Sequence, residues 1–116
     1  MSLQRVLLPL DGSGLSEGIV PCVSQVAKAL GLKVTIFYVT ALEEAASGQP
    51  TLTRLPQGAK TTVSAYLADM EEAVVKQGVT AVDSVMTAGV PSVEIVRYAD
   101  ENGYDLIAMA THGRSG

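Results

Sequence analysis

Short runs of apolar residues alternate along the chain with longer segments whose apolar positions recur at helical spacing. The runs at residues 6–8, 34–39 and 106–110 are dense in aliphatic and β-branched residues, which predicts strands buried on both faces of a sheet. A further strand is expected at residues 79–87, which are less apolar and therefore predicted nearer to the sheet edge. Pro9 should end the first strand, because proline has no N–H to donate to a neighbouring strand.

Amphipathic helices are predicted between these strands. The first precedes Gly31 and contains Pro21, which should kink it or mark a late start. Its expected inward positions are Leu15, Ile19, Val23, Val26 or Ala27, and Leu30. The second begins at Ala59 and ends at Gly78, and its expected inward positions are Val63, Tyr66 or Leu67, Met70, and Ala73 or Val74. The third begins at Pro91 and ends before Gly103, and its expected inward positions are Ile95, Val96 and Ala99.

Residues 40–58 have no sustained period and contain Gly48, Pro50 and Pro56, which predicts a long surface loop. Because strands and helices otherwise alternate, the chain is predicted to be an α/β protein with an open, doubly wound, Rossmann-like parallel sheet and right-handed crossovers. A length of 116 residues fits one domain.

Composition and charge narrow the possible partners. The formal charge of −4 and the pI near 4.8 disfavour nonspecific nucleic-acid binding, which depends on clustered basic residues. No apolar run approaches the roughly 20 residues that span a bilayer, and no secretion signal is evident, so we expect no membrane association and a cytoplasmic location. The single Cys22 lies among helical apolar positions and is predicted to be a buried, inert thiol.

Two polar turns that follow predicted strands form the candidate site. One contains Asp11, Gly12 and Gly14, and the other is the segment at residues 111–116. Ligands of such sheets bind beyond the carboxyl ends of the strands, and glycines let backbone amides approach an anion. Asp11 either binds a ligand hydroxyl or amine, or caps its own turn, and these two roles are compatible.

Other binding motifs fit the sequence poorly. After Gly12 and Gly14, the third position of a dinucleotide fingerprint holds Glu17, and no Gly-Lys-Ser or Gly-Lys-Thr completes a P-loop. A response-regulator site is disfavoured because the third predicted strand ends in Met86 and Thr87, with no aspartate to accept a phosphoryl group. His112 is the only histidine and has neither a metal-binding cluster nor an evident catalytic partner in the sequence.

Three segments resemble the universal stress protein family. They are VLLPLDGSGLSE at residues 6–17, GVPSVEIVRYA at residues 89–99 and DLIAMATHGRSG at residues 105–116. The resemblance implies a single domain over residues 1–116 with strand order 3-2-1-4-5, whose strand 5 and last helix are absent from this sequence. ATP-binding members carry a glycine, two residues, a second glycine, nine residues, and a glycine followed by Ser or Thr. Here Ala110 holds the first position, Gly113 the second, and the third lies beyond Gly116.

The resemblance also implies which residues bind a nucleotide. Asp11 would line an adenosine pocket, and the backbone of Val39 and Thr40 would contact the adenine edge. Arg114 either pairs with a phosphate or is a solvated loop residue. The full predicted set is Pro9, Leu10, Asp11, Val39, Thr40, Met109, Ala110, His112, Gly113, Arg114 and Gly116.

The function expected from this resemblance is that of a regulatory module of the stress response that binds ATP or another adenine nucleotide, with or without Mg²⁺, and forms a homodimer. The phosphates of the bound nucleotide would order the loop after the fourth strand and so change the surface offered to a partner. One alternative is a non-nucleotide-binding member that acts as a protein-interaction module. A slow ATPase is the third alternative, although no residue that would activate water can be named.

Overall fold

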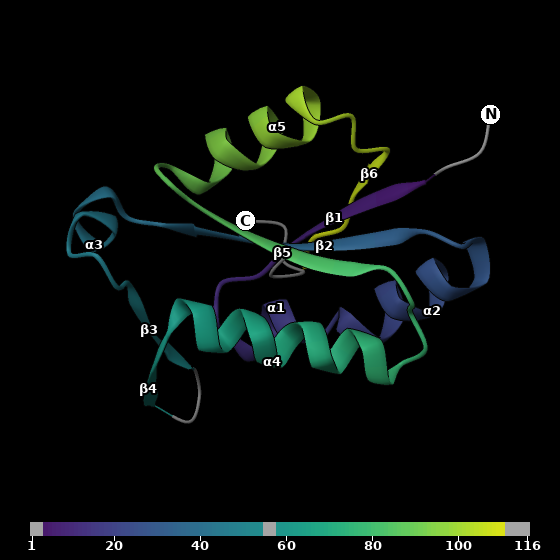
Figure 1. Cartoon of the computed structure of the whole chain (residues 1–116), viewed down its shortest axis with the longest axis horizontal. Coiled ribbons are helices and arrows are strands. Elements are labelled where there is room, and N and C mark those ends of the chain that lie inside the picture. The colour runs from purple at the N-terminus through teal and green to yellow at the C-terminus, as the bar shows by residue number, and fades with distance from the viewer. Residues whose placement is uncertain (1–3, 55–57, 111–116) are drawn as a thin grey trace, which may run out of the picture.

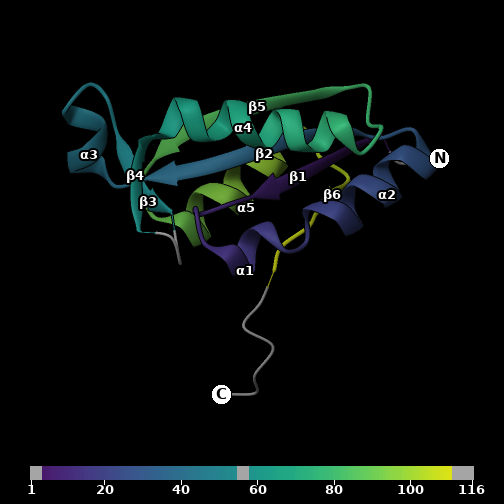
Figure 2. The same ribbon diagram turned by 90° about the horizontal axis from the view of Figure 1, so that it is seen from below.

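The computed structural model describes residues 4–54 and 58–110 and shows a parallel sheet with helices on both faces (Figures 1 and 2). The sheet order is β5-β2-β1-β6. Its strands are β1 (Arg5–Pro9), β2 (Lys33–Thr40), β5 (Val82–Ala88) and β6 (Leu106–Ile107). This order confirms the arrangement 3-2-1-4 predicted for the four strands, and it places β1 and β6, the two strands followed by the candidate turns, side by side.

Helices cover the two faces of the sheet and divide the core into two layers. The helices are α1 (Gly14–Glu17), α2 (Val20–Leu30), α3 (Leu42–Ala46), α4 (Val63–Lys76) and α5 (Pro91–Glu101). In Figure 1, α5 lies on one face, and α1, α2 and α4 lie on the other. Leu8 and Ile36 pack in the cluster on the α2 and α4 side, whereas Leu7 and Phe37 pack against α5. Adjacent strand residues thus point to opposite faces, as the pleat requires.

The first predicted helix is divided in two. Pro21 is the second residue of α2, which confirms the late start, and Gly31 caps the helix with φ +69°. The chain breaks its helical course between α1 and α2, so positions counted across the break do not share one face. Leu15 and Leu30 are therefore exposed, contrary to prediction, while Ala27 is buried. The buried face of α2 consists of Val20, Ser24 and Ala27. Cys22 lies off that face and is exposed, so the prediction of a buried thiol was wrong.

The prediction of a long loop at residues 40–58 was also wrong. It contains α3 and the strand β3 (Thr51–Arg54), which pairs antiparallel with β4 (Ala59–Thr62) in a sheet of their own. The second long helix consequently begins at Val63 rather than at Ala59, because the Thr62 hydroxyl accepts a hydrogen bond from the Ala65 N–H and caps it. We call β3 and β4 together the hairpin.

The last described strand is shorter and more exposed than its apolar sequence predicts. Only Leu106 and Ile107 pair with β1, and their exposed fractions are 38% and 41%. Within the described residues β6 has a neighbouring strand on one side only, which explains the exposure. Val96 on α5 is 62% exposed rather than inward, because the buried face of that helix runs through Ile95 and Ala99.

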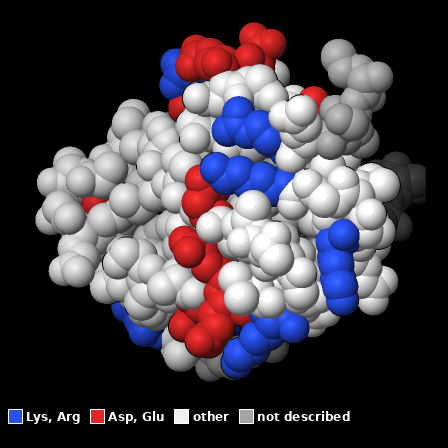
Figure 3. Space-filling view, turned by 45° about the vertical axis from the view of Figure 1, so that its right-hand side comes forward, with Lys and Arg blue, Asp and Glu red and all other residues white. Residues whose placement is uncertain are grey.

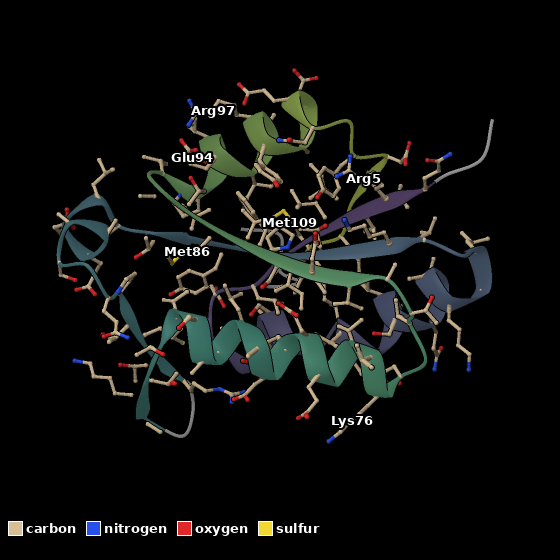
Figure 4. The ribbon with its side chains drawn as sticks, viewed as in Figure 1. Arg5, Lys76, Met86, Glu94, Arg97 and Met109 are labelled. Atoms are coloured by element: carbon tan, nitrogen blue, oxygen red, sulfur yellow. The ribbon has the colours of Figure 1, made fainter. Side chains whose placement is uncertain are left out.

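Contacts at the amino end of β1 hold the start of β6. The Asp105 carboxylate accepts hydrogen bonds from the Gln4 and Arg5 N–H groups at 2.8 and 2.9 Å. The Arg5 guanidinium lies 4.2 Å from the centre of the Tyr104 ring (Figure 4 labels Arg5). These contacts anchor the start of β6, and at its end the Ala108 N–H donates a hydrogen bond to the Leu7 carbonyl at 2.9 Å.

No helix within residues 4–54 and 58–110 has the length and apolar character needed to cross a membrane.

Candidate functional site

A cavity of about 190 Å³ opens at the carboxyl ends of β1 and β2, between the chain leaving β6 and the first turns of α5. The strand order reverses between β1 and β6, on one side of this cavity, and ligands of open parallel sheets bind at such a point. Its lining residues are Pro9, Leu10, Asp11, Ser16, Phe37, Val39, Pro91, Ile95, Met109 and Ala110.

The cavity brings together six residues of the set predicted from sequence. They are Pro9, Leu10, Asp11, Val39, Met109 and Ala110. Thr40, the last residue of β2, is buried and does not line the cavity. The remaining predicted residues, His112, Gly113, Arg114 and Gly116, lie outside the described residues.

Sequence reasoning missed Ser16, Phe37, Pro91 and Ile95. Phe37 could have been found from the two-residue period of β2, since it shares a face with Val39. Pro91 and Ile95 lie one helical turn apart at the start of α5, which follows β5 rather than β1 or β6. No local pattern indicates that this turn reaches the cavity.

The cavity is mainly apolar and is closed on one side by well-packed residues. Phe37 is fully buried, and its ring stacks on Tyr98 with centroids 4.8 Å apart, so its position is fixed by α5. Ile95 is 6% exposed and belongs to the same core cluster. Met109 is 53% exposed and lies on the α5 side of the sheet in the view of Figure 4. Its flexible thioether gives the cavity an adaptable rim.

Asp11 is the carboxylate of the cavity, and it also caps the turn after β1. Its Oδ1 accepts a hydrogen bond from the Ser13 N–H at 2.9 Å, while its own N–H donates to the Ser16 hydroxyl at 3.3 Å. Partial burial raises the pKa of Asp11, but hydrogen bonds from Ser13 and Ser16 outweigh it and hold the pKa below its ordinary value. Asp11 is therefore ionised at neutral pH. An ionised carboxylate has several acceptor positions, so the capping bond leaves capacity for a ligand.

The turn after Asp11 is ordered by the start of α1. Ser13 is the N-cap of this helix, and its hydroxyl oxygen accepts a hydrogen bond from the Ser16 N–H at 3.1 Å. The Ser16 hydroxyl in turn donates to the Ser13 carbonyl at 3.1 Å. These local bonds hold Ser16 at the start of α1, where it lines the cavity.

None of the described side chains that line the cavity carries a positive charge. Of the arginines in the described segments, Arg54 is paired with Glu17, and Arg97 with Glu94 on α5, where Figure 4 shows the latter two side by side. On the face seen in Figure 3, basic side chains are interspersed with acidic ones and form no basic patch. Residues 4–54 and 58–110 also contain no group of three or more potential metal ligands. An anion here would depend on backbone amides or on residues after Ala110.

Solved structures share this fold at low sequence identity. A universal stress protein in complex with cAMP is 23% identical, with a TM-score of 0.72, and the match covers 94% of this chain and 73% of that one. Protein Rv1636 from Mycobacterium tuberculosis H37Rv is 24% identical, with a TM-score of 0.70 and coverages of 100% and 77%. The hypothetical protein MJ0577, solved for a structure-based assignment of its biochemical function, is 20% identical, with a TM-score of 0.72 and coverages of 98% and 78%.

The sequence comparisons give one match. None of the curated proteins compared is similar in sequence. The model of the universal stress protein family matches residues 2–116, which include both strand-end turns and all the cavity-lining residues. The chain therefore belongs to the universal stress protein family.

Proposed function

We propose that the chain binds an adenine nucleotide, ATP in the first place, in the cavity at the ends of β1 and β6, and that it acts as a regulatory module of the stress response. The observation that carries the proposal is one apolar cavity at the reversal of strand order, lined both by the turn after β1 and by Met109 and Ala110, which follow β6. A universal stress protein of the same fold has been solved in complex with cAMP, which supports an adenine nucleotide as the ligand class.

In the proposed complex the base occupies the apolar part of the cavity. Phe37, Val39 and Ile95 supply apolar surface, and Asp11 accepts hydrogen bonds from ribose hydroxyl groups. The volume of about 190 Å³ is below the roughly 300–1,000 Å³ typical of pockets that enclose drug-sized ligands. A nucleoside would therefore fill the cavity, and the phosphates would extend past Ala110.

In this proposal, residues that follow Ala110 in the sequence hold the nucleotide phosphates and any metal ion. We assign phosphate contacts to the predicted residues His112, Gly113, Arg114 and Gly116. Asp11 is the one carboxylate among the lining residues, which fits a Mg²⁺ ion that is carried mainly by the nucleotide phosphates. Nucleotide binding would order the loop predicted after the fourth strand and alter the surface offered to a protein partner or to a second copy in a homodimer. We place this activity in the cytoplasm.

A non-nucleotide interaction module is the second candidate. Ala110 stands where ATP-binding members of the family carry the first glycine of the phosphate motif, and none of the described residues that line the cavity is basic. Both observations favour a cavity that holds no nucleotide over one that binds the phosphates of ATP.

Calorimetric titration with ATP, and separately with cAMP, tests the proposal. We expect saturable heat with ATP, and a large loss of affinity in Met109→Glu, which places a negative charge at the cavity rim. Met86→Glu is the matched control, because Met86 is 42% exposed on β5 and lies away from Met109 (Figure 4). No heat and no rise in melting temperature at millimolar concentrations of either nucleotide would reject the proposal. If the titration with cAMP releases heat and the titration with ATP does not, the ligand is cAMP rather than ATP. Sedimentation with and without ATP tests the homodimer.

A further inference from the structure

The segment between β1 and the end of α1 has two faces. Asp11 and Ser16 line the cavity. The residues that follow them directly, Gly12 and Glu17, both contact Tyr66 instead, at the start of α4. Each polar cavity residue is thus attached to a neighbour that is anchored outside the cavity.

Gly12 is the first anchor. Its N–H donates a hydrogen bond to the Tyr66 hydroxyl oxygen at 3.2 Å, and this bond is buried. Gly12 has φ +87°, and a Cβ added there would lie 2.4 Å from Leu52 Cδ1. Leu52 is the buried residue of β3. The turn therefore lies directly against the Leu52 side chain of the hairpin, and its positive φ favours glycine.

Glu17 is the second anchor and joins α1 to both α4 and the hairpin. Its Oε2 accepts a hydrogen bond from the Tyr66 hydroxyl at 2.7 Å, and its Oε1 pairs with the Arg54 Nη2 at 2.9 Å. The Arg54 guanidinium also lies 5.2 Å from the centre of the Tyr66 ring. Burial, followed by the hydrogen bond and charge of Glu17, raises the pKa of Tyr66. The phenol remains a hydrogen-bond donor throughout the physiological range.

We propose that Tyr66, Glu17 and Arg54 are positioning residues for the cavity, which hold Asp11 and Ser16 in place and couple the hairpin to ligand binding. The identity of the ligand in this statement rests on the proposed nucleotide function, whereas the positioning of the turn does not. A ligand that bonds to Asp11 stabilises one conformation of the turn, and the two anchors transmit this preference to β3. The hairpin then becomes more protected when the cavity is occupied, although it contributes no lining residue.

The variant Tyr66→Phe removes one hydroxyl and both of its hydrogen bonds. Tyr38→Phe is its matched control, because Tyr38 lies edge-on to Tyr66, with ring centroids 6.2 Å apart, and does not contact Gly12 or Glu17 through a hydrogen bond. Without ligand, we expect amide hydrogen exchange at Gly12 and Ser13 to be about tenfold faster in Tyr66→Phe than in Tyr38→Phe. Exchange in β2 serves as the internal reference, and any change in its rate is subtracted from this comparison. Exchange within twofold of that in Tyr38→Phe would overturn the proposal.

Glu17 provides an independent test that leaves the buried ring intact. Glu17→Ala should accelerate exchange at Gly12 and Ser13 as Tyr66→Phe does. Glu17→Gln keeps a side-chain oxygen that accepts from the Tyr66 hydroxyl, and should restore most of the protection. A general loss of stability would accelerate exchange throughout the sheet and would show no rescue by glutamine. Normal protection of the turn in Glu17→Ala would overturn the proposal.

Titration with ATP separates this proposal from the proposed function. We expect ATP to slow exchange at Leu52 and Thr53 in the wild type, and its Kd to rise about five- to tenfold in Tyr66→Phe relative to Tyr38→Phe. Absence of ATP binding in the wild type would reject the nucleotide function, while the exchange experiments without ligand still decide the positioning. ATP binding that is equally tight in both tyrosine variants would reject the positioning and leave the nucleotide function intact.

Discussion

Replacing Gly12 by alanine should destabilise the fold more than a glycine-to-alanine change elsewhere at the same backbone angle. Two costs add at this position. At φ +87° a side chain is strained by about 1–2 kcal/mol. The new Cβ would also lie 2.4 Å from Leu52 Cδ1, and relieving this contact in a packed site costs about 1–3 kcal/mol. We therefore expect a loss of about 2–5 kcal/mol in the free energy of unfolding.

Gly48→Ala is the matched control. Gly48 has φ +92°, and no heavy atom of the described residues lies within 4 Å of the position its Cβ would take. This variant carries the backbone strain without the contact with Leu52, so it should lose about 1–2 kcal/mol.

Urea unfolding, followed by circular dichroism at equal protein concentration, measures the free energy of unfolding for both variants. The difference between them isolates the contact between the turn and the hairpin, and we expect it to be about 1–3 kcal/mol. Equal stabilities, or a greater loss in Gly48→Ala, would refute the packing of β3 against the cavity turn.

Three further outcomes follow from individual residues. Ile95→Ala should cost about 2–5 kcal/mol in urea unfolding, whereas Val96→Ala, next to it on α5 but 62% exposed, should cost under about 1 kcal/mol. Hydrogen bonds from the N–H groups of Gln4 and Arg5 lower the pKa of Asp105 in the folded state. The ionised Asp105 carboxylate therefore stabilises the fold fully above the unfolded pKa of about 3.9. This stabilisation is lost as the pH falls through the lower pKa of the folded state. Acid unfolding of Asp105→Asn should therefore depend less on pH below about 4 than that of the wild type. Because the pKa of Asp11 is also lowered, ATP affinity measured by calorimetry should not change between pH 6 and 8 through titration of Asp11, and an Asp11-dependent fall across that range would contradict this assignment.

The four strands of the main sheet could be predicted because their pattern is local. Residues 34–39 are almost continuously apolar or β-branched, and β2 lies between two other strands, so the pattern and the environment agree. Pro91 and Gly31 marked helix ends through backbone constraints that act within a few residues. Strand order came from the resemblance to the family, which carries topological information that apolar periodicity lacks.

The hairpin could not be predicted because its stability comes from distant contacts. β3 contains one buried apolar residue, Leu52, and β4 begins with two exposed residues, so neither has a clear strand pattern. Leu52 packs against Gly12, and Arg54 pairs with Glu17, residues that are roughly forty positions earlier in the sequence. The exposure of Val96 was missed for a related reason, since apolar composition does not determine which side of a helix meets the sheet.

The candidate cavity could be predicted where it depends on strand ends and not where it depends on a helix packed from elsewhere. Pro9, Leu10, Asp11 and Ala110 follow from the rule that ligands bind beyond the carboxyl ends of parallel strands. Ile95 and Pro91 reach the cavity because α5 crosses the face of the sheet against Phe37. For the residues at the strand ends and for those on α5 alike, contact with a nucleotide remains a prediction.

NMR spectra of the backbone amides, recorded during titration of the isotope-labelled chain with ATP, would locate the ligand directly. We expect the largest shift changes to cluster at Leu10, Asp11, Val39, Ile95 and Ala110, around the ends of β1 and β6. Changes concentrated at the opposite end of the sheet, near Asp83 and Tyr104, or no changes at saturating ATP, would contradict a nucleotide site in this cavity.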